Sequence, residues 1–145
     1  MSQYLHITAH HKAGNDKSIC LAWWGTSIAR SEDMTDAFPY TEDDRLVSFT
    51  DFGERVRTVS KAVDKKRQDI NKLNNERQDL IALMQGCKES AAVDAMLERI
   101  DENEKTLDDA KNNYAEWQHI LTTLEIILNI YEDNKDNWDI YYSNC

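Results

Sequence analysis

The sequence of residues 56–84 is VRTVSKAVDKKRQDINKLNNERQDLIALM, and its apolar residues repeat with the alternating three- and four-residue spacing of a heptad. The positions on this seam are Val56, Val59, Val63, Lys66, Ile70, Leu73, Arg77, Leu80 and Met84. Only Lys66 and Arg77 are polar, and so regular a seam is typical of a coiled-coil helix. The stretch predicts a long helix at about residues 52–86, with Asp51 and Glu54 as a capping box.

A second seam follows the interruption at Gly86 and predicts a helix at about residues 90–132. Its positions are Val93, Met96, Ile100, Asn103, Leu107, Ala110, Tyr114, Trp117, Leu121, Leu124, Leu128 and Tyr131. The short connection favours an antiparallel hairpin over residues 51–132. A register with Arg77 opposite Asn103 places two polar exceptions in one layer, whereas a shift by one heptad leaves both unpaired, at about 1–3 kcal/mol each. We therefore expect Arg77 and Asn103 to form a register-setting polar layer.

Residues 1–50 have a different pattern, which is typical of β structure. We expect a hairpin of two strands, an acidic loop and a short third strand, at residues 3–11, 18–28, 31–44 and 45–49. We expect the aromatic tail of residues 133–145 to dock on this head or to add a strand to it. The predicted class is therefore α+β, with a small N-terminal antiparallel β-rich head followed by a long antiparallel two-helix coiled-coil hairpin.

The charge of the chain restricts its partners. Its 145 residues fit one domain and include 17 Lys+Arg against 27 Asp+Glu, for a net charge of −10. This balance disfavours direct binding to nucleic acid or to an anionic membrane surface. It favours solubility or attraction to a protein partner with a basic surface. No window approaches the roughly 18 apolar residues of a membrane span.

The cysteines and the N-terminus predict a cytoplasmic protein. Cys20, Cys87 and Cys145 are an odd number and have no CxxC spacing, which favours reduced thiols. The first residues, MSQYLHITAHH, lack the basic and apolar regions of a secretory signal.

His6, His10 and His11 lie within six residues and raise the question of a metal site. On a strand, His6 and His10 share a face but are separated by about 13 Å. That distance is too long for one metal ion with bonds of about 2.1 Å. We therefore expect no metal and no cofactor, and we expect the core-facing residues of this strand to be Leu5, Ile7 and Ala9.

The candidate partner-binding residues are aromatic and acidic side chains of the head and tail. Trp23 and Trp24 are adjacent, so one could be core and the other an exposed anchor, or both could be buried against the second helix, which we favour. The acidic loop lacks the spacing of a calcium site but suits a basic protein. The full set is Trp23, Trp24, Asp33, Asp36, Phe38, Tyr40, Asp43, Asp44, Trp138 and Tyr141.

No catalytic motif is present: we find no GxSxG, P-loop or GxGxxG pattern, and we expect no enzyme. The expected function is a non-catalytic acidic interaction protein that binds and blocks or sequesters a partner. We expect a homodimer, because the apolar surface of residues 120–130 exceeds what one helix covers. The composition suits a phage or mobile-element inhibitor of a host system. The alternatives are a small-molecule or nucleotide-binding protein with a pocket at a dimer interface, and a metal-dependent enzyme that uses the N-terminal histidines.

Overall fold

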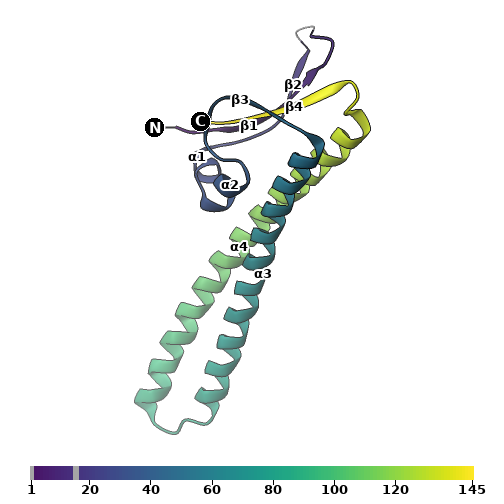
Figure 1. Cartoon of the computed structure of the whole chain (residues 1–145). Helices are drawn as coiled ribbons and strands as arrows, with labels where there is room; N and C mark the ends of the chain where they lie inside the picture. Colours follow the sequence, from purple (N-terminus) through teal and green to yellow (C-terminus); the bar gives the residue numbers. More distant parts are fainter. Residues whose placement is uncertain (1, 15–16) are drawn as a thin grey trace. The chain divides into compact units, whose positions relative to one another are not determined.

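The computed structural model describes residues 2–14 and 17–145 and confirms the predicted α+β class. A four-stranded antiparallel sheet is combined with two long helices that run side by side (Figure 1). The strands are β1 (Leu5–His11), β2 (Ser18–Trp24), β3 (Thr41–Val47) and β4 (Trp138–Asn144), in the spatial order β2-β1-β4-β3. The helices are α1 (Thr26–Ala29), α2 (Glu32–Ala37), α3 (Phe49–Gln85) and α4 (Ser90–Asn134).

The described chain divides into two compact units. The first, which we term the head, consists of the residues up to Ala62 together with Ile120–Cys145. It holds the sheet, the two short helices and the neighbouring ends of α3 and α4. The second unit, Val63–His119, is termed the distal hairpin. The two long helices therefore contribute to both units.

The C-terminal segment forms a central strand of the sheet. β4 lies between β1 and β3, and it pairs with β1 from Leu5 opposite Asn144 to His11 opposite Trp138. Alternate residues of β4, namely Ile140, Tyr142 and Asn144, are buried. The aromatic tail thus completes the sheet, through pairs between the two ends of the chain.

β1 buries the face that the alternation of apolar and polar residues along the strand predicted. Leu5 and Ile7 are 0% exposed and Ala9 is 6% exposed, which confirms the expectation for these three residues. His6 and His10 lie on the opposite face, where they pair with Ser143 and Asp139.

The second strand ends earlier than the sequence indicated. β2 stops at Trp24 instead of residue 28, and α1 follows. The Thr26 hydroxyl donates to Gln3 O over 3.1 Å and accepts from Gln3 N over 3.0 Å. These two bonds hold the chain beside the start of β1 and redirect it into α1.

The expectation of an acidic loop over residues 31–44 is wrong. Ser31 caps α2, because its side-chain oxygen accepts from Met34 N over 3.4 Å. Glu32 and Asp33 occupy the first turn of α2, where negative charge interacts favourably with the helix dipole. β3 then begins at Thr41, four residues before the expected strand.

α3 begins at Phe49, and the predicted capping residue is wrong. Ser48 Oγ accepts from Asp51 N over 3.1 Å, so Ser48 is the capping side chain. Asp51 instead forms an ion pair with Arg55 over 3.2 Å, one helical turn later.

In the distal hairpin, polar contacts join α3 and α4. Asn103 Nδ2 donates to Leu73 O over 3.2 Å, and Arg77 forms an ion pair with Glu104 over 3.5 Å. Both seam residues therefore bond across the helix pair, each to a different partner. Their joint register-setting role stays a prediction.

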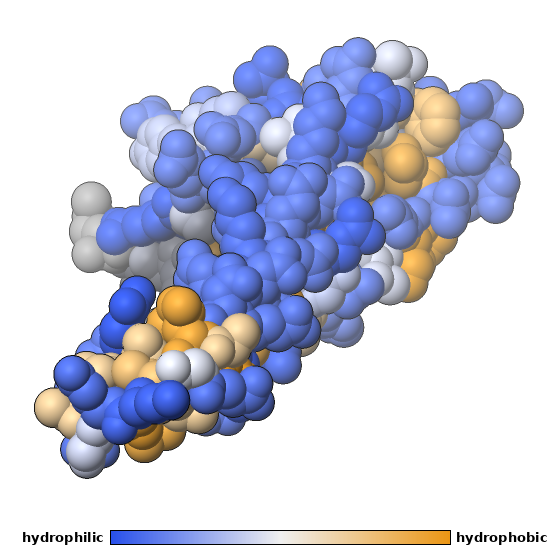
Figure 2. All heavy atoms as spheres, turned by 90° about the horizontal axis from the view of Figure 1, so that it is seen from below, coloured by the Kyte–Doolittle hydropathy of each residue, from blue (hydrophilic) through white to orange (hydrophobic). Residues whose placement is uncertain are grey.

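The tip of the distal hairpin carries exposed apolar side chains, which are visible from below in Figure 2. Leu83 and Leu97 are 58% and 49% exposed.

Among the described residues, no helix is long and apolar enough to cross a membrane.

Candidate functional site: an acidic edge of the sheet

The segment between α2 and β3 is held by three side chains of the head. Three consecutive backbone carbonyl groups each accept one hydrogen bond. The bonds are from Arg55 Nη1 to Ala37 O (2.7 Å), from Asn144 Nδ2 to Phe38 O (2.8 Å) and from the Tyr142 hydroxyl to Pro39 O (3.2 Å). Since each anchor comes from α3 or β4, the segment is fixed to the centre of the head.

Arg55 is the charged anchor of this segment. Its guanidinium carbon lies 4.9 Å from the centre of the Tyr142 ring and 5.8 Å from that of Phe38. With Asp51 and Ala37 O as its other partners, the guanidinium is neutralised and hydrogen-bonded where it is largely buried. Arg55 therefore acts within the head and is not available to a ligand.

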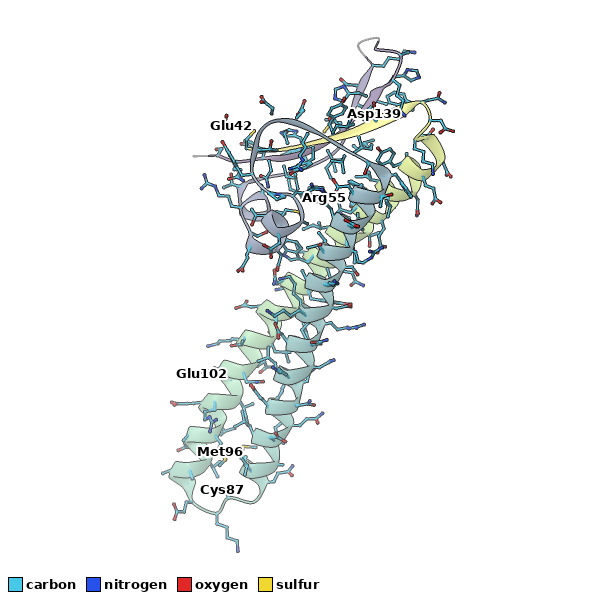
Figure 3. The ribbon with its side chains drawn as sticks, viewed as in Figure 1. Glu42, Arg55, Cys87, Met96, Glu102 and Asp139 are labelled. Carbon is cyan, nitrogen blue, oxygen red and sulfur yellow. The ribbon has the colours of Figure 1, made fainter. Side chains whose placement is uncertain are left out.

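A three-residue bulge follows at the start of β3. Thr41 is opposite Asn144 and Arg45 is opposite Tyr142, so Glu42, Asp43 and Asp44 face a single residue of β4. A bulge takes residues out of the ladder and turns their side chains outward. Figure 3 shows Glu42, the first residue of this bulge, at the margin of the head and Arg55 on α3 within the head.

The bulge is exposed and acidic. Glu42, Asp43 and Asp44 are all exposed, and Tyr40 just before them is 61% exposed. We term Tyr40, Glu42, Asp43 and Asp44 the acidic edge. Among the described residues, no lysine, arginine or histidine forms an ion pair with its three carboxylates. The acidic edge thus presents three exposed carboxylates without an ion-pair partner in the described part of the chain, next to one exposed aromatic ring and followed by Arg45 on the same strand.

The structure brings together some of the predicted partner-binding residues. Tyr40, Asp43 and Asp44 share the acidic edge, while Asp36 is exposed and Asp33 half-buried on the preceding helix α2. Phe38 is 0% exposed, so its assignment as a partner contact is wrong. Its ring packs against Tyr142 with a centroid distance of 5.2 Å, because the anchored carbonyl groups turn this side chain into the core.

The two predicted tryptophans lie at the opposite edge of the sheet. β2 and β3 are the two outer strands, so Trp23 and Trp24 are separated from the acidic edge by β1 and β4. Trp23 is 60% exposed and Trp24 is half-buried, so the expectation that both are buried is wrong. Trp23 faces outward because it pairs with His6, on the face that the helices do not cover.

Trp138 and Tyr141 are half-buried and point to opposite faces of β4. Each packs edge-on against a histidine of β1: Tyr141 against His10 at 4.7 Å and Trp138 against His11 at 5.0 Å between ring centroids. Within the described ranges, no cluster of three or more His, Cys, Asp or Glu side chains is arranged to hold a metal ion.

Four residues that matter for the acidic edge were not among the candidates. Glu42 belongs to the same run of acids and could have been included on composition alone. The anchors Arg55, Tyr142 and Asn144 had no local signal, because their roles depend on contacts with residues that are 18, 103 and 106 positions away.

No protein-family model, no curated protein and no solved structure matches this chain.

Proposed function

We propose that this chain is a non-catalytic interaction protein that binds a basic surface of a partner protein through its acidic edge and thereby blocks or sequesters that partner. The observation that carries the proposal is the bulge at Glu42–Asp44, which exposes, next to Tyr40, three carboxylates without an ion-pair partner among the described residues. Exposed aromatic residues are common anchors of protein interfaces, and complementary charge increases the rate and selectivity of association.

The anchoring of the acidic edge supports recognition by a preformed surface. Tyr142, Asn144 and Arg55 fix the segment that leads into the bulge. A fixed segment loses little conformational entropy when it binds, which favours affinity.

The charges also determine how a partner can bind. Like charges and bulges on an outer strand prevent another strand from pairing with it. We therefore assign recognition to the side chains of the acidic edge, and strand addition at β3 is disfavoured. The proposal includes a cytoplasmic setting, in which free thiols such as Cys20, Cys87 and Cys145 persist.

The proposal is tested by affinity capture from the native host with three baits. The first is the wild-type chain. The second carries Glu42→Gln, Asp43→Asn and Asp44→Asn. The third is a matched control with the same loss of charge on exposed positions of α4, namely Asp94→Asn, Glu98→Gln and Asp108→Asn.

We expect the wild-type and control baits to retain the same basic protein, and the acidic-edge variant to lose it at least tenfold. A partner that all three baits retain equally, or that only the control loses, would place recognition elsewhere. Equal circular dichroism spectra of the baits establish that the substitutions leave the fold intact.

A second candidate function is the binding of a small anionic ligand. A cavity of about 510 Å³ lies at the end of the β1–β2 hairpin, and its lining includes His10, His11, Lys17 and the ion pair of Lys12 with Asp139 over 3.8 Å. Its volume is in the range of small-molecule sites. Native mass spectrometry with a panel of nucleotides tests this function, and Lys17→Gln should abolish any adduct that forms there.

A further inference from the structure

The two outer strands of the sheet differ in their protection against pairing. β3 (TEDDRLV) carries four charged residues and a bulge, whereas β2 (SICLAWW) carries no charged residue at all. An exposed, uncharged outer strand is a template for pairing with another chain. Only a bulge, at which Leu21 has no partner on β1, interrupts β2.

An apolar groove adjoins β2 on the helix side of the sheet. It lies between β2 and the C-terminal part of α4 and has a volume of about 170 Å³. The residues lining it are all uncharged: Ala9, Ile19, Leu21, Ile130, Tyr131, Asn134, Trp138 and Ile140. Ile19 and Ile130 remain 51% and 46% exposed, although they are β-branched apolar residues.

The apolar surface continues along α4. Ile126 is one helical turn before Ile130 and is 54% exposed, so the two side chains form a stripe on one face of the helix. β2, the groove and this stripe all belong to the head. They form one surface, which we term the apolar edge and define as the uncharged residues Ile19, Leu21, Ile126 and Ile130; the exposed Asp133, one helical turn after Ile130, ends it on α4.

We propose that a second copy of this chain covers the apolar edge. A net charge of −10 by itself opposes self-association, so two copies should associate only through a surface on which no like charges come into contact. The apolar edge and the adjoining strand β2 are such a surface. In a two-fold dimer the same surface meets itself, so its lack of charge is self-complementary.

In this dimer, β2 of one copy lies along β2 of the other, and the stripes of Ile126 and Ile130 pack together. The bulge at Leu21 increases the local twist of β2 and shortens the paired stretch. The helix stripes therefore supply much of the buried apolar area. The acidic edge lies on the opposite outer strand, so both copies keep it exposed.

The mass in solution tests this proposal without reference to any other partner. Light scattering with size-exclusion chromatography should give twice the chain mass of 16.9 kDa for the wild type at about 100 μM. Ile126→Glu with Ile130→Glu should give the mass of one chain. The matched control replaces two comparably exposed residues of the distal hairpin, Leu83→Glu with Leu97→Glu, and should remain dimeric.

A crosslinking measurement locates the interface independently. Cys20 is exposed and one residue from the middle of β2, whereas Cys145 is exposed beside Glu42 of β3. With neighbouring strands about 4.8 Å apart, a short bis-maleimide should crosslink a variant that retains only Cys20. A variant that retains only Cys145 should stay uncrosslinked.

Three outcomes would overturn the proposal. One is a wild-type chain that remains monomeric at about 100 μM. Another is a dimer that Leu83→Glu with Leu97→Glu dissociates while the Ile126 and Ile130 changes do not, which would place the interface at the hairpin tip. The third is a dimer in which Cys145 crosslinks and Cys20 does not.

Discussion

Asn144 joins more parts of the head than any other polar side chain described above. It is 0% exposed, it donates to Ala29 O over 3.0 Å and to Phe38 O over 2.8 Å, and its oxygen accepts from Gln3 Nε2 over 2.7 Å. Both the amide nitrogen and the amide oxygen of this buried side chain are thus hydrogen-bonded. It links the end of α1, the end of α2 and the N-terminal segment to β4.

Replacing Asn144 with alanine should be strongly destabilising. The carbonyl groups of Ala29 and Phe38 would lose their donor, at about 1–3 kcal/mol for each buried group left unpaired. We expect urea denaturation to show a loss of at least about 2 kcal/mol. The control is Asn134→Ala on the exposed end of α4, which should change stability by less than about 0.5 kcal/mol. Equal effects of the two substitutions would contradict the role of Asn144.

Tyr131 should make the head sensitive to alkali. Burial raises the pKa of its phenol, and the negative charge of Asp139 raises it further. The hydroxyl donates to Val47 O over 2.7 Å. Above about pH 10 the unfolded chain releases this proton while the folded chain retains it, so the free energy of unfolding should fall as pH rises.

Denaturation at a series of pH values above 9 checks this prediction. Tyr131→Phe should be less stable at neutral pH by about 1 kcal/mol, yet its stability should fall less steeply above about pH 10. Tyr40→Phe is the control, because Tyr40 is 61% exposed and should leave the slope unchanged. An identical alkaline slope for wild type and Tyr131→Phe would contradict it.

At the scale of elements, the seam of the distal hairpin contains a buried polar residue that is only partly hydrogen-bonded. Asn103 is 8% exposed, and its Oδ1 is buried and accepts no hydrogen bond from the described residues. A polar residue on a coiled-coil seam lowers stability while it favours one register. Asn103→Leu should therefore stabilise the chain by about 1–3 kcal/mol, measured as a higher urea midpoint.

Asn112→Leu is the matched control for this change, since Asn112 is an exposed residue of the same helix. It should leave the midpoint within about 0.5 kcal/mol of the wild type. A lower urea midpoint for Asn103→Leu would contradict the prediction, because it would mean that the Asn103 amide makes a net favourable contribution to stability.

The sequence predicted some elements better than others for a physical reason. The long helices follow from a local seam, and only their ends moved, because Ser48 replaced Asp51 as the cap. α2 was missed because it is short, lies between Ser31 and Pro39 and is rich in acids, a composition that also suits a loop. For the tail, an added strand and docking on the head were both expected, but its central place between β1 and β3 was not predicted, because strand pairing between the two ends of a chain has no local signal.

At the scale of the whole molecule, the candidate site was predictable only in its chemistry. Composition indicated acids and aromatics in the head. It could not indicate that Phe38 turns into the core while Tyr40 turns out, since that depends on anchors from α3 and β4. Nor could it indicate that Trp23 lies at the opposite edge of the sheet, because the order of the strands is set by non-local pairing.

We propose that the two edges of one sheet serve two kinds of contact. The acidic edge is charged and anchored, and the apolar edge is uncharged and self-complementary. Binding at the acidic edge should weaken as salt rises, because screening shortens the range of interactions between exposed charges from about 30 Å at 0.01 M to about 3 Å at 1 M. Contact between two copies at the apolar edge should not weaken as salt rises, because the burial of apolar surface does not depend on charge.

The most direct measurement of the central claim is therefore the amount of captured partner as a function of salt, with the wild-type chain as bait. Recognition by the acidic edge predicts that retention falls steeply as salt rises, and that the variant with Glu42→Gln, Asp43→Asn and Asp44→Asn binds weakly at every salt concentration. Retention that is independent of salt and identical for the two baits would contradict the assignment of partner binding to the acidic edge.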